Sequence, residues 1–343
     1  MTDIPDEPAI PETPDAPEES ESRSLGGPRQ TQGYLRNLLD ANGLRPRRQL
    51  GQNFLIDLNL LEMLVESAHV GPDDVVLEVG AGTGGLTSRL GALAKRVVTV
   101  EIDPGFQRLV RREIAGLSNV ELICGDVLDG KNKINPEVMA AVRRALDETG
   151  RSHYQLVANL PYDVATSVVG NLMLEDPDIT SLTITVQFEV GQRMIAEPGK
   201  KDYGPLSVLI QRLGRARWLR TLGPTVFWPR PNVDSCFLRI EVDPEKRVDL
   251  PHLRVWHRFV RDLFMHRRKT LRSGIVSIPG YKQAKPRIDG VLAALGIPGD
   301  VRAETLAPSQ LFDLHAALVP LLAGGGPIED ANSADAGDQS DGN

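Results

Sequence analysis

The feature that most constrains the fold is a strand-like run that enters a glycine-rich turn, VVLEVGAGTGG at residues 75–85. Glycine lets a backbone turn sharply and approach a ligand closely, and the helix after such a turn offers unpaired N–H groups. The glycines at 80, 82 and 85 match the GxGxxG of dinucleotide sites. Counted from Glu78, the stretch equally fits the ExGxGxG typical of S-adenosylmethionine (SAM) enzymes, so both interpretations stay open.

The order strand then helix is repeated along the chain. Short β-rich runs alternate with segments in which apolar residues recur at helical spacing. Repeated βα units predict the α/β class, a mostly parallel, doubly wound sheet with right-handed crossovers. The expected strands are 75–79, 97–102, 120–123, 155–158 and 182–187, and the expected helices are 31–42, 58–68, 85–93, 105–116, 136–148 and 165–174, the fifth with Asn135 as its N-cap.

Carboxylates follow two of the expected strands, at the edge where such sheets bind ligands. Glu101 ends the second strand, about 20 residues after the glycines, where a carboxylate accepts both hydroxyls of a ribose. Asp103 is the alternative partner, although it follows the strand. Asp126 ends the third strand and can accept the exocyclic amine hydrogen of an adenine; a turn carboxylate would look the same.

The fourth strand ends on Asn159-Leu160-Pro161-Tyr162. Proline has no N–H and favours an extended residue before it, which presents carbonyl groups beside the Asn159 side chain. Asn159 Oδ1 and a main-chain carbonyl are then two acceptors for the amine of a base, and Tyr162 can stack on that base. Held this way, the nitrogen lone pair can face a methyl donor. Asp163 comes next, and we expect it to cap the following helix.

The two ends of the chain differ from its middle. Residues 1–30 hold eight acidic and two basic residues, and residues 322–343 hold five acidic residues and no Lys or Arg. Both are poor in large apolar groups, so we expect disordered acidic tails. Of the total charge of −7, the middle keeps +4. No run of about 18 apolar residues occurs, so we expect no membrane contact. Two cysteines without a CxxC pair indicate a reducing cytoplasm and no metal site.

After residue 242 the β signals end and helical patterns continue to about residue 322. We therefore expect a boundary near 243–249, which gives a Rossmann-like domain over 31–245 and a helical, RNA-binding domain over 246–321. The stretch 254–272 holds seven Lys or Arg and one acidic residue, and 212–220 adds four arginines. Together they suggest a groove for RNA phosphates. The candidate RNA-binding residues are Arg254, Arg258, Arg261, Arg267, Arg268 and Lys269.

Nine motifs in this order resemble the ribosomal small-subunit adenine dimethyltransferases, the 16S rRNA dimethyladenosine transferases, from about residue 47 to 311. They are LGQNFLID (50–57), LEVGAGTGGLT (77–87), VEID (100–103), GDVL (125–128), NLPY (159–162), KDYGPLSVLIQ (201–211), FWPRPNVDS (227–235), RRKTLR (267–272) and RAETL (302–306). The resemblance implies a Rossmann-like SAM-dependent methyltransferase domain with a smaller C-terminal α-helical domain.

The resemblance also implies roles for single residues. Asn53 and Leu55 would close over SAM, Gly80 would lie at its methionine moiety, Glu101 at its ribose and Asp126 at its adenine. Asn159 would touch cofactor and substrate, and Tyr162 and Phe227 would flank the target adenine. Three departures concern the substrate rim: Asp163 replaces an aromatic or amide residue, Phe188 replaces a lysine, and the 127–153 segment is longer than usual.

The resemblance implies dimethylation of N6 on two adjacent adenosines near the 3′ end of 16S rRNA, in the small (30S) subunit or its precursor, by a monomer with a role in subunit biogenesis. Three alternatives remain: an adenine N6-methyltransferase acting on large-subunit rRNA, a non-catalytic small-subunit assembly factor, and a dinucleotide oxidoreductase. The motifs RRKTLR and RAETL favour the small subunit.

Overall fold

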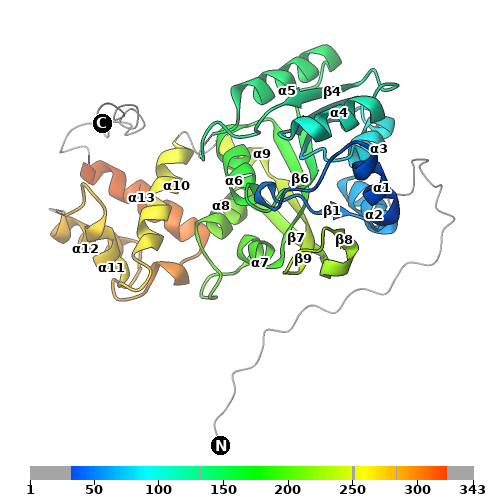
Figure 1. The fold of residues 1–343 in the computed structure, drawn as a ribbon. Helices are drawn as coiled ribbons and strands as arrows, with labels where there is room; N and C mark the ends of the chain where they lie inside the picture. The colour runs from blue at the N-terminus through cyan, green and yellow to red at the C-terminus, as the bar shows by residue number, and fades with distance from the viewer. Residues whose placement is uncertain (1–31, 132, 249–251, 283, 323–343) are drawn as a thin grey trace, which may run out of the picture.

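The computed structural model describes residues 32–131, 133–248, 252–282 and 284–322. The predictions for the acidic tails lie outside these residues, apart from Leu322. Figure 1 shows an α/β part that surrounds a central sheet and a separate group of C-terminal helices beside it. Among the described residues, no helix combines the length and the apolar character needed to cross a membrane.

The central sheet has seven strands in the order β4-β3-β2-β5-β6-β9-β7. Its first five strands are parallel, as the βα repeats predict. The register places the carboxyl ends of neighbouring strands together, with Val79 opposite Val100 and Glu101 opposite Cys124. The parallel strands are β2 (Val75–Val79), β3 (Arg96–Glu101), β4 (Val120–Cys124), β5 (Tyr154–Asn159) and β6 (Ile179–Gln187).

The helices that connect these strands begin close to the predicted residues. Asn135 caps α5, because its side chain accepts the Glu137 N–H at 2.9 Å. The 127–153 segment is mostly this helix, which packs on β2, β3 and β4 as an ordinary crossover. The helices are α1 (Gln32–Ala41), α2 (Leu58–Ala68), α3 (Gly85–Leu93), α4 (Pro104–Glu113), α5 (Pro136–Thr149) and α6 (Ala165–Glu175).

Two antiparallel strands complete the sheet beyond β6. The outer strand β7 (Gly214–Leu222) pairs with β9 (Ser235–Val242), which pairs with β6. The helices α7 (Phe188–Ile195) and α8 (Pro205–Leu213) precede β7, and the 3-10 turn η2 (Pro224–Val226) follows it. A separate two-stranded sheet joins β1 (Phe54–Leu55) to β8 (Phe227–Trp228), so the LGQNFLID and FWPRPNVDS motifs meet.

The C-terminal helices pack mainly on one another and on α8. Two hydrogen bonds also join the loop after α7 to the RAETL motif: Tyr203 Oη donates to the Leu306 carbonyl at 2.9 Å, and the Gly199 N–H donates to the Glu304 carbonyl at 2.7 Å. Arg267 of the C-terminal part pairs with Glu304 and donates to the Lys201 carbonyl in that loop. These elements are α9 (Pro244–Val248), α10 (Leu253–Met265), α11 (Leu271–Ser277), α12 (Lys285–Ala294), the 3-10 turn η3 (Ala303–Thr305) and α13 (Pro308–Leu322).

Candidate active site

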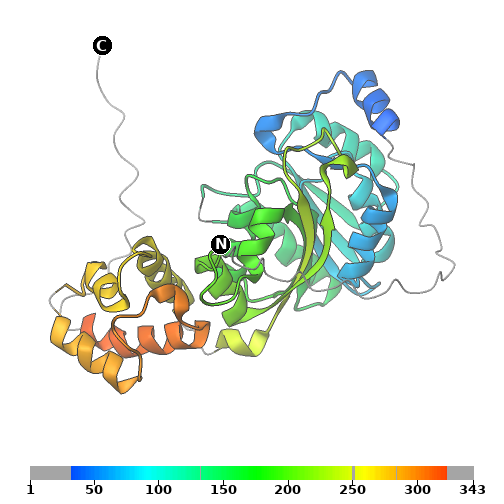
Figure 2. The same ribbon diagram turned by 90° about the horizontal axis from the view of Figure 1, so that it is seen from below.

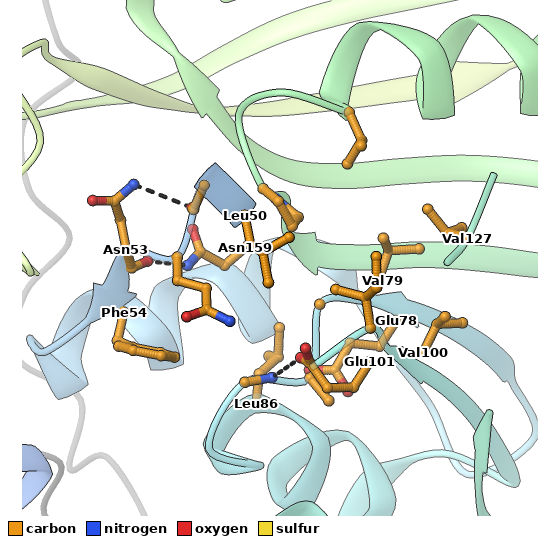
Figure 3. Close-up of a pocket in the computed structure, with 18 of the residues that line it drawn as sticks. Leu50, Asn53, Phe54, Glu78, Val79, Leu86, Val100, Glu101, Val127 and Asn159 are labelled. Carbon is orange, nitrogen blue, oxygen red and sulfur yellow. Dashed lines mark hydrogen bonds between the residues drawn. The ribbon is translucent and has the colours of Figure 1, made fainter. Parts of the chain in front are cut away.

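A cavity of about 290 Å³ lies at the carboxyl ends of the parallel strands. Its walls are the glycine-rich turn after β2, the ends of β3 and β5, and the loop after β4 (Figure 3). The segment 49–55 forms another wall and approaches the tip of β5. All six predicted cofactor-binding residues line it, and so does Pro161 of the NLPY motif; the six are Asn53, Leu55, Gly80, Glu101, Asp126 and Asn159.

The glycine-rich turn has room only for glycine where it passes its neighbours. Gly80 has φ +84°, and a Cβ there would lie 3.1 Å from the Pro161 ring. Gly82 has φ +58°, and a Cβ there would lie 2.9 Å from the Phe54 ring. Both positions also require the left-handed region that favours glycine. The turn is therefore packed between the NLPY motif and the 49–55 segment, with its backbone facing the cavity.

Glu78 is a site residue that the sequence analysis used only as part of a pattern. Its side chain is 1% exposed and lines the cavity. Oε2 accepts hydroxyl hydrogens from Thr87 at 2.6 Å and Thr99 at 2.7 Å, whereas Oε1 has no hydrogen-bond partner among the described residues. Burial, assisted by the nearby Glu101 charge, raises the pKa of Glu78 to about 7. An unpaired buried acceptor is costly, so this oxygen points to a ligand with a hydrogen-bond donor.

Glu101 and Asp103, the two candidates for a ribose, have different surroundings. Glu101 lines the cavity, and its carboxylate is fixed by the N–H groups of Gly82 at 2.8 Å and Asp103 at 2.9 Å. Burial raises its pKa. Asp103 caps α4 through the Gly105 N–H, and its other oxygen lies 3.5 Å from Arg47 Nε. Asp103 does not line the cavity, which leaves Glu101 as the candidate.

Asp126 combines a local role with a free oxygen. Its Oδ1 accepts the Leu128 N–H at 2.9 Å, which shapes the turn after β4. Its carbonyl accepts from Asn135 Nδ2 at 2.9 Å, so the α5 cap also fixes this turn. Oδ2 has no hydrogen bond within the described chain and is available to the cavity that Asp126 lines.

The amide of Asn159 is oriented by the 49–55 segment. Its Nδ2 donates to the main-chain carbonyl of Asn53 at 2.9 Å (Figure 3). A carbonyl oxygen can only accept, so the amide NH₂ must face Asn53 and Oδ1 must face away from it. Asn159 therefore presents a fixed acceptor at the tip of β5. The Asn53 side chain turns back on its own loop and donates to the Gly51 carbonyl at 3.2 Å.

The other NLPY residues divide between core and rim. Leu160 is 2% exposed and packs in the core, and the Pro161 ring covers Gly80. Tyr162 is half-buried; its Oη lies 2.6 Å from Oγ of Ser235, a fully buried residue at the start of β9. Burial raises the Tyr162 pKa. Ser235 therefore fixes where the ring of Tyr162 lies.

Three residues that the sequence associated with the substrate, Asp163, Phe188 and Phe227, lie in different surroundings. The prediction that Asp163 caps α6 is wrong, because the helix begins at Ala165 and its N-cap is Val164, whose side chain makes no capping hydrogen bond. Asp163 lines the cavity instead. Phe227 is 2% exposed and packs beside Leu55 in the core, so the structure does not bring it to the cavity. Phe188 packs edge-on against Trp218, with ring centroids 5.1 Å apart.

The candidate RNA-binding residues are all on or just after α10, with different surroundings. Arg254 pairs with Glu175, and Arg267 pairs with Glu304 and donates to the Lys201 carbonyl. Lys269 Nζ contacts Ser277 Oγ at 2.8 Å. The remaining three, Arg258, Arg261 and Arg268, have exposed side chains.

Comparison with known proteins decides the family. The model of the ribosomal RNA adenine dimethylase family matches residues 43–314. The chain belongs to this family. Ribosomal RNA small subunit methyltransferase A of Geobacillus kaustophilus is 36% identical over 293 residues, which cover 85% of this chain and 97% of the relative. The protein of that name from Moorella thermoacetica is 36% identical over 288 residues, covering 84% and 98%.

Two solved structures confirm the fold. A dimethyladenosine transferase from Plasmodium falciparum superposes with a TM-score of 0.65 at 22% identity, covering 77% of this chain and 97% of that one. The 23S rRNA methyltransferase ErmE superposes with a TM-score of 0.57 at 24% identity, covering 77% and 99%. Membership of the ribosomal RNA adenine dimethylase family confirms the resemblance and the enzyme class, a SAM-dependent rRNA adenine dimethyltransferase. The oxidoreductase interpretation of the glycine turn is therefore wrong.

The residues of this family member fit SAM on two observations. The orphaned Glu78 Oε1 needs a donor, and SAM carries an ammonium group on its methionine moiety. A Cβ at Gly80 or Gly82 would collide with the Pro161 or Phe54 ring, so this wall of the cavity must stay a bare backbone that a ligand can approach closely. The other polar groups of the cavity include the carboxylate oxygens of Glu101 and Asp126. These oxygens can accept hydrogen bonds from the hydroxyl and amine groups of a nucleoside.

Proposed function

We propose that this protein transfers methyl groups from SAM to N6 of two adjacent adenosines near the 3′ end of 16S rRNA, in the small ribosomal subunit or its precursor. The modification would accompany subunit biogenesis, and the enzyme would act as a cytoplasmic monomer. The observation that carries the proposal is the fixed Oδ1 of Asn159 at the cavity. The curated relatives, named for the small subunit, support the choice of rRNA.

In this proposal, three carboxylate side chains accept hydrogen bonds from the cofactor, and the amide of Asn159 serves the substrate. Glu78 Oε1 accepts from the methionine ammonium, Glu101 from the ribose hydroxyls, and the free oxygen of Asp126 from the adenine amine. Asn53 and Leu55 close the cavity from the 49–55 segment, and Gly80 lets the backbone approach the methionine moiety. When bound, SAM supplies an electrophilic methyl group.

In the first transfer, Asn159 Oδ1 and a main-chain carbonyl of the NLPY motif accept the two hydrogens of the target amine; in the second, the singly methylated amine has one hydrogen left for them. The lone pair of an adenine amine is conjugated with the ring, which makes it a weak nucleophile. Two acceptors favour a pyramidal nitrogen whose lone pair faces the methyl group. The methylated amine can lose its proton afterwards, so no general base is required. In this proposal Tyr162, whose Oη lies 2.6 Å from Ser235 Oγ, stacks on the flipped base.

We also propose that cofactor binding and RNA binding belong to different domains. Every proposed cofactor contact comes from residues 31–245, and the helices of 246–321 would hold RNA. Two alternatives remain beside the proposal, one with a different substrate and one without catalysis. Action on large-subunit rRNA is disfavoured by the names of the relatives, and a non-catalytic assembly factor is disfavoured by the complete set of acceptors at the cavity.

The proposal is tested by incubating the protein with labelled SAM and small subunits that lack the modification, then mapping the labelled bases. We expect label on two adjacent adenosines, with two methyl groups on each. Large subunits serve as the parallel substrate, and the Asn159→Ala variant as the matched protein control. Label on large subunits alone would establish the first alternative, and particle binding without label would establish the second.

A further inference from the structure

A second group of arginines lies far from the C-terminal helices. It comprises Arg36 on α1, Arg45 and Arg47 on the loop after it, and Arg108, Arg111 and Arg112 on α4, all exposed; we call it the N-terminal arginine surface. Acidic residues on these three segments are few: Asp40 and Glu113, besides the buried Asp103 that caps α4.

Apolar packing brings these segments together. Leu35 and Leu39 of α1 share a buried cluster with Phe106 and Leu109 of α4. Leu44 also packs on Gly105, at the start of α4. Because the apolar faces of both helices meet, their polar faces turn outward side by side, and the arginines form one continuous surface.

These arginines bond almost entirely to neutral acceptors. Arg108 donates to the Pro104 carbonyl at 3.1 Å, and Arg112 to Asn42 Oδ1 at 2.8 Å. Arg111 donates to Cys124 Sγ at 3.0 Å. Within the described chain, Arg36 and Arg45 form no side-chain hydrogen bond or ion pair. Among the described residues, Arg47 is the one arginine of this surface that forms an ion pair, with Asp103.

The arginines of the C-terminal lobe are more often neutralised. Arg254 pairs with Glu175, Arg267 with Glu304, and Arg272 with both oxygens of Asp289. A guanidinium without a carboxylate keeps its full charge and spare donors for a phosphate. The less neutralised surface is thus the one that the charge count along the sequence did not single out.

The position of the surface suits an extended substrate. In both views α1 lies at the end of the molecule opposite α10–α13 (Figures 1 and 2). The surface also adjoins the cavity, because Arg111 contacts Cys124 next to the Gly125–Asp126 wall. A folded RNA particle extends far beyond one flipped base, and phosphate contacts spread over a wide area supply most of its affinity.

We propose that the N-terminal arginine surface binds backbone phosphates of the rRNA substrate, as a second RNA footprint separate from the C-terminal helices. The inference rests on the proposed function, since it takes the small subunit as the substrate. The two footprints would hold RNA on either side of the cavity and so fix the region from which the target adenosine flips.

The test compares two double variants that lose equal charge. Arg36→Gln with Arg108→Gln removes two cations of the surface without touching the cavity. The matched control, Arg144→Gln with Arg151→Gln, removes two arginines of α5 and the turn after it that pair with Glu121 and Asp73. Binding to unmodified small subunits is measured across a salt series, together with SAM affinity and a melting curve.

We expect the first variant to bind subunits more weakly, with a slope of log affinity against log salt shallower by about 1.5 units. SAM affinity and melting should match wild type, and Arg36→Lys with Arg108→Lys should restore binding. An unchanged slope, or an equal loss in the matched control, would overturn the inference. Wild-type labelling of small subunits, run in parallel, reports on the proposed function separately: if it succeeds while the slope is unchanged, only the footprint is wrong.

Discussion

The strand-tip cavity and the arginine surfaces hold their functional groups in different ways. At the cavity, Glu78, Glu101 and Asn159 are each fixed by hydrogen bonds of 2.6 to 2.9 Å with neighbouring groups. On the surfaces, Arg36, Arg261 and Arg268 are exposed side chains on helices or just after them. Methyl transfer requires the reacting groups to be held in one defined geometry, whereas phosphate binding requires only that positive charge is spread over an area. Substitutions should therefore have large, specific effects at the cavity and small, additive effects on the surfaces.

The largest effect is expected at Asn159. Asn159→Ala removes one of two acceptors for the target amine, and removal of one such fixed group costs about 10²–10³-fold in turnover. Single-turnover methyl transfer to small subunits measures it. Binding of subunits should match wild type, because phosphate contacts dominate that affinity. Near-normal turnover would show that the amine is held elsewhere.

The next effect concerns Asp126. Asp126→Ala should weaken SAM binding about 10–150-fold, the value of one hydrogen bond to a charged acceptor at about 1.5–3 kcal/mol. Calorimetric titration with SAM measures it. Asp129→Ala, three residues along the same loop, removes a carboxylate that pairs with Lys133 and should leave SAM affinity unchanged. Equal affinities in both variants would remove Asp126 from the site.

A smaller effect is expected from pH. The pKa of Glu78 is raised to about 7 without ligand, and only its carboxylate form attracts an ammonium. SAM affinity should therefore fall by up to about tenfold per pH unit below pH 7. The folded state binds the proton more tightly than the unfolded chain, so the apo protein should lose stability as pH rises from about 4.5 to 7. In Glu78→Gln both trends should flatten; persistence of both would assign them to Glu101 or another group.

The smallest effects are expected at two adjacent arginines, Arg267 and Arg268, which we expect to have different roles. Arg268→Gln should make the salt slope for subunit binding shallower by about 0.7–0.9 and leave the melting temperature unchanged. Arg267→Gln should instead destabilise the protein by about 1–2 kcal/mol, because Glu304 and the Lys201 carbonyl lose their partner. Salt titrations and melting curves on both variants distinguish the two roles. Identical behaviour would mean that both arginines face RNA or that neither does.

The parallel half of the sheet could be predicted almost to the residue. Strand 75–79 and helix 85–93 have the predicted limits, because a buried strand, a glycine turn and a periodic helix are local signals. The outer strand β7 was not predicted, because the arginines of 212–220 suggested an RNA groove instead. In the structure, Arg212 lies over the Phe312 ring at 4.7 Å, and Arg217 pairs with Glu241.

Three site residues could be predicted because their residue type and their position at the end of a strand together indicate their role. Glu101, Asp126 and Asn159 each follow or end a parallel strand, and the topology brings them to one cavity. Glu78 was missed as a ligand because its role depends on an oxygen left unpaired by Thr87 and Thr99, from separate elements. The capping prediction for Asp163 was wrong because a turn from Pro161 to Val164 starts the helix later.

The most direct test of this division of tasks is a variant in which Arg36, Arg108, Arg261 and Arg268 are all replaced by Gln. SAM affinity by calorimetry and subunit affinity across a salt series are measured on the same preparation, with a melting curve. We predict SAM affinity within about twofold of wild type, weakened subunit binding, and a salt slope shallower by about 3 units. Subunit binding that keeps its wild-type slope, or SAM affinity that falls together with it at an unchanged melting temperature, would contradict the account.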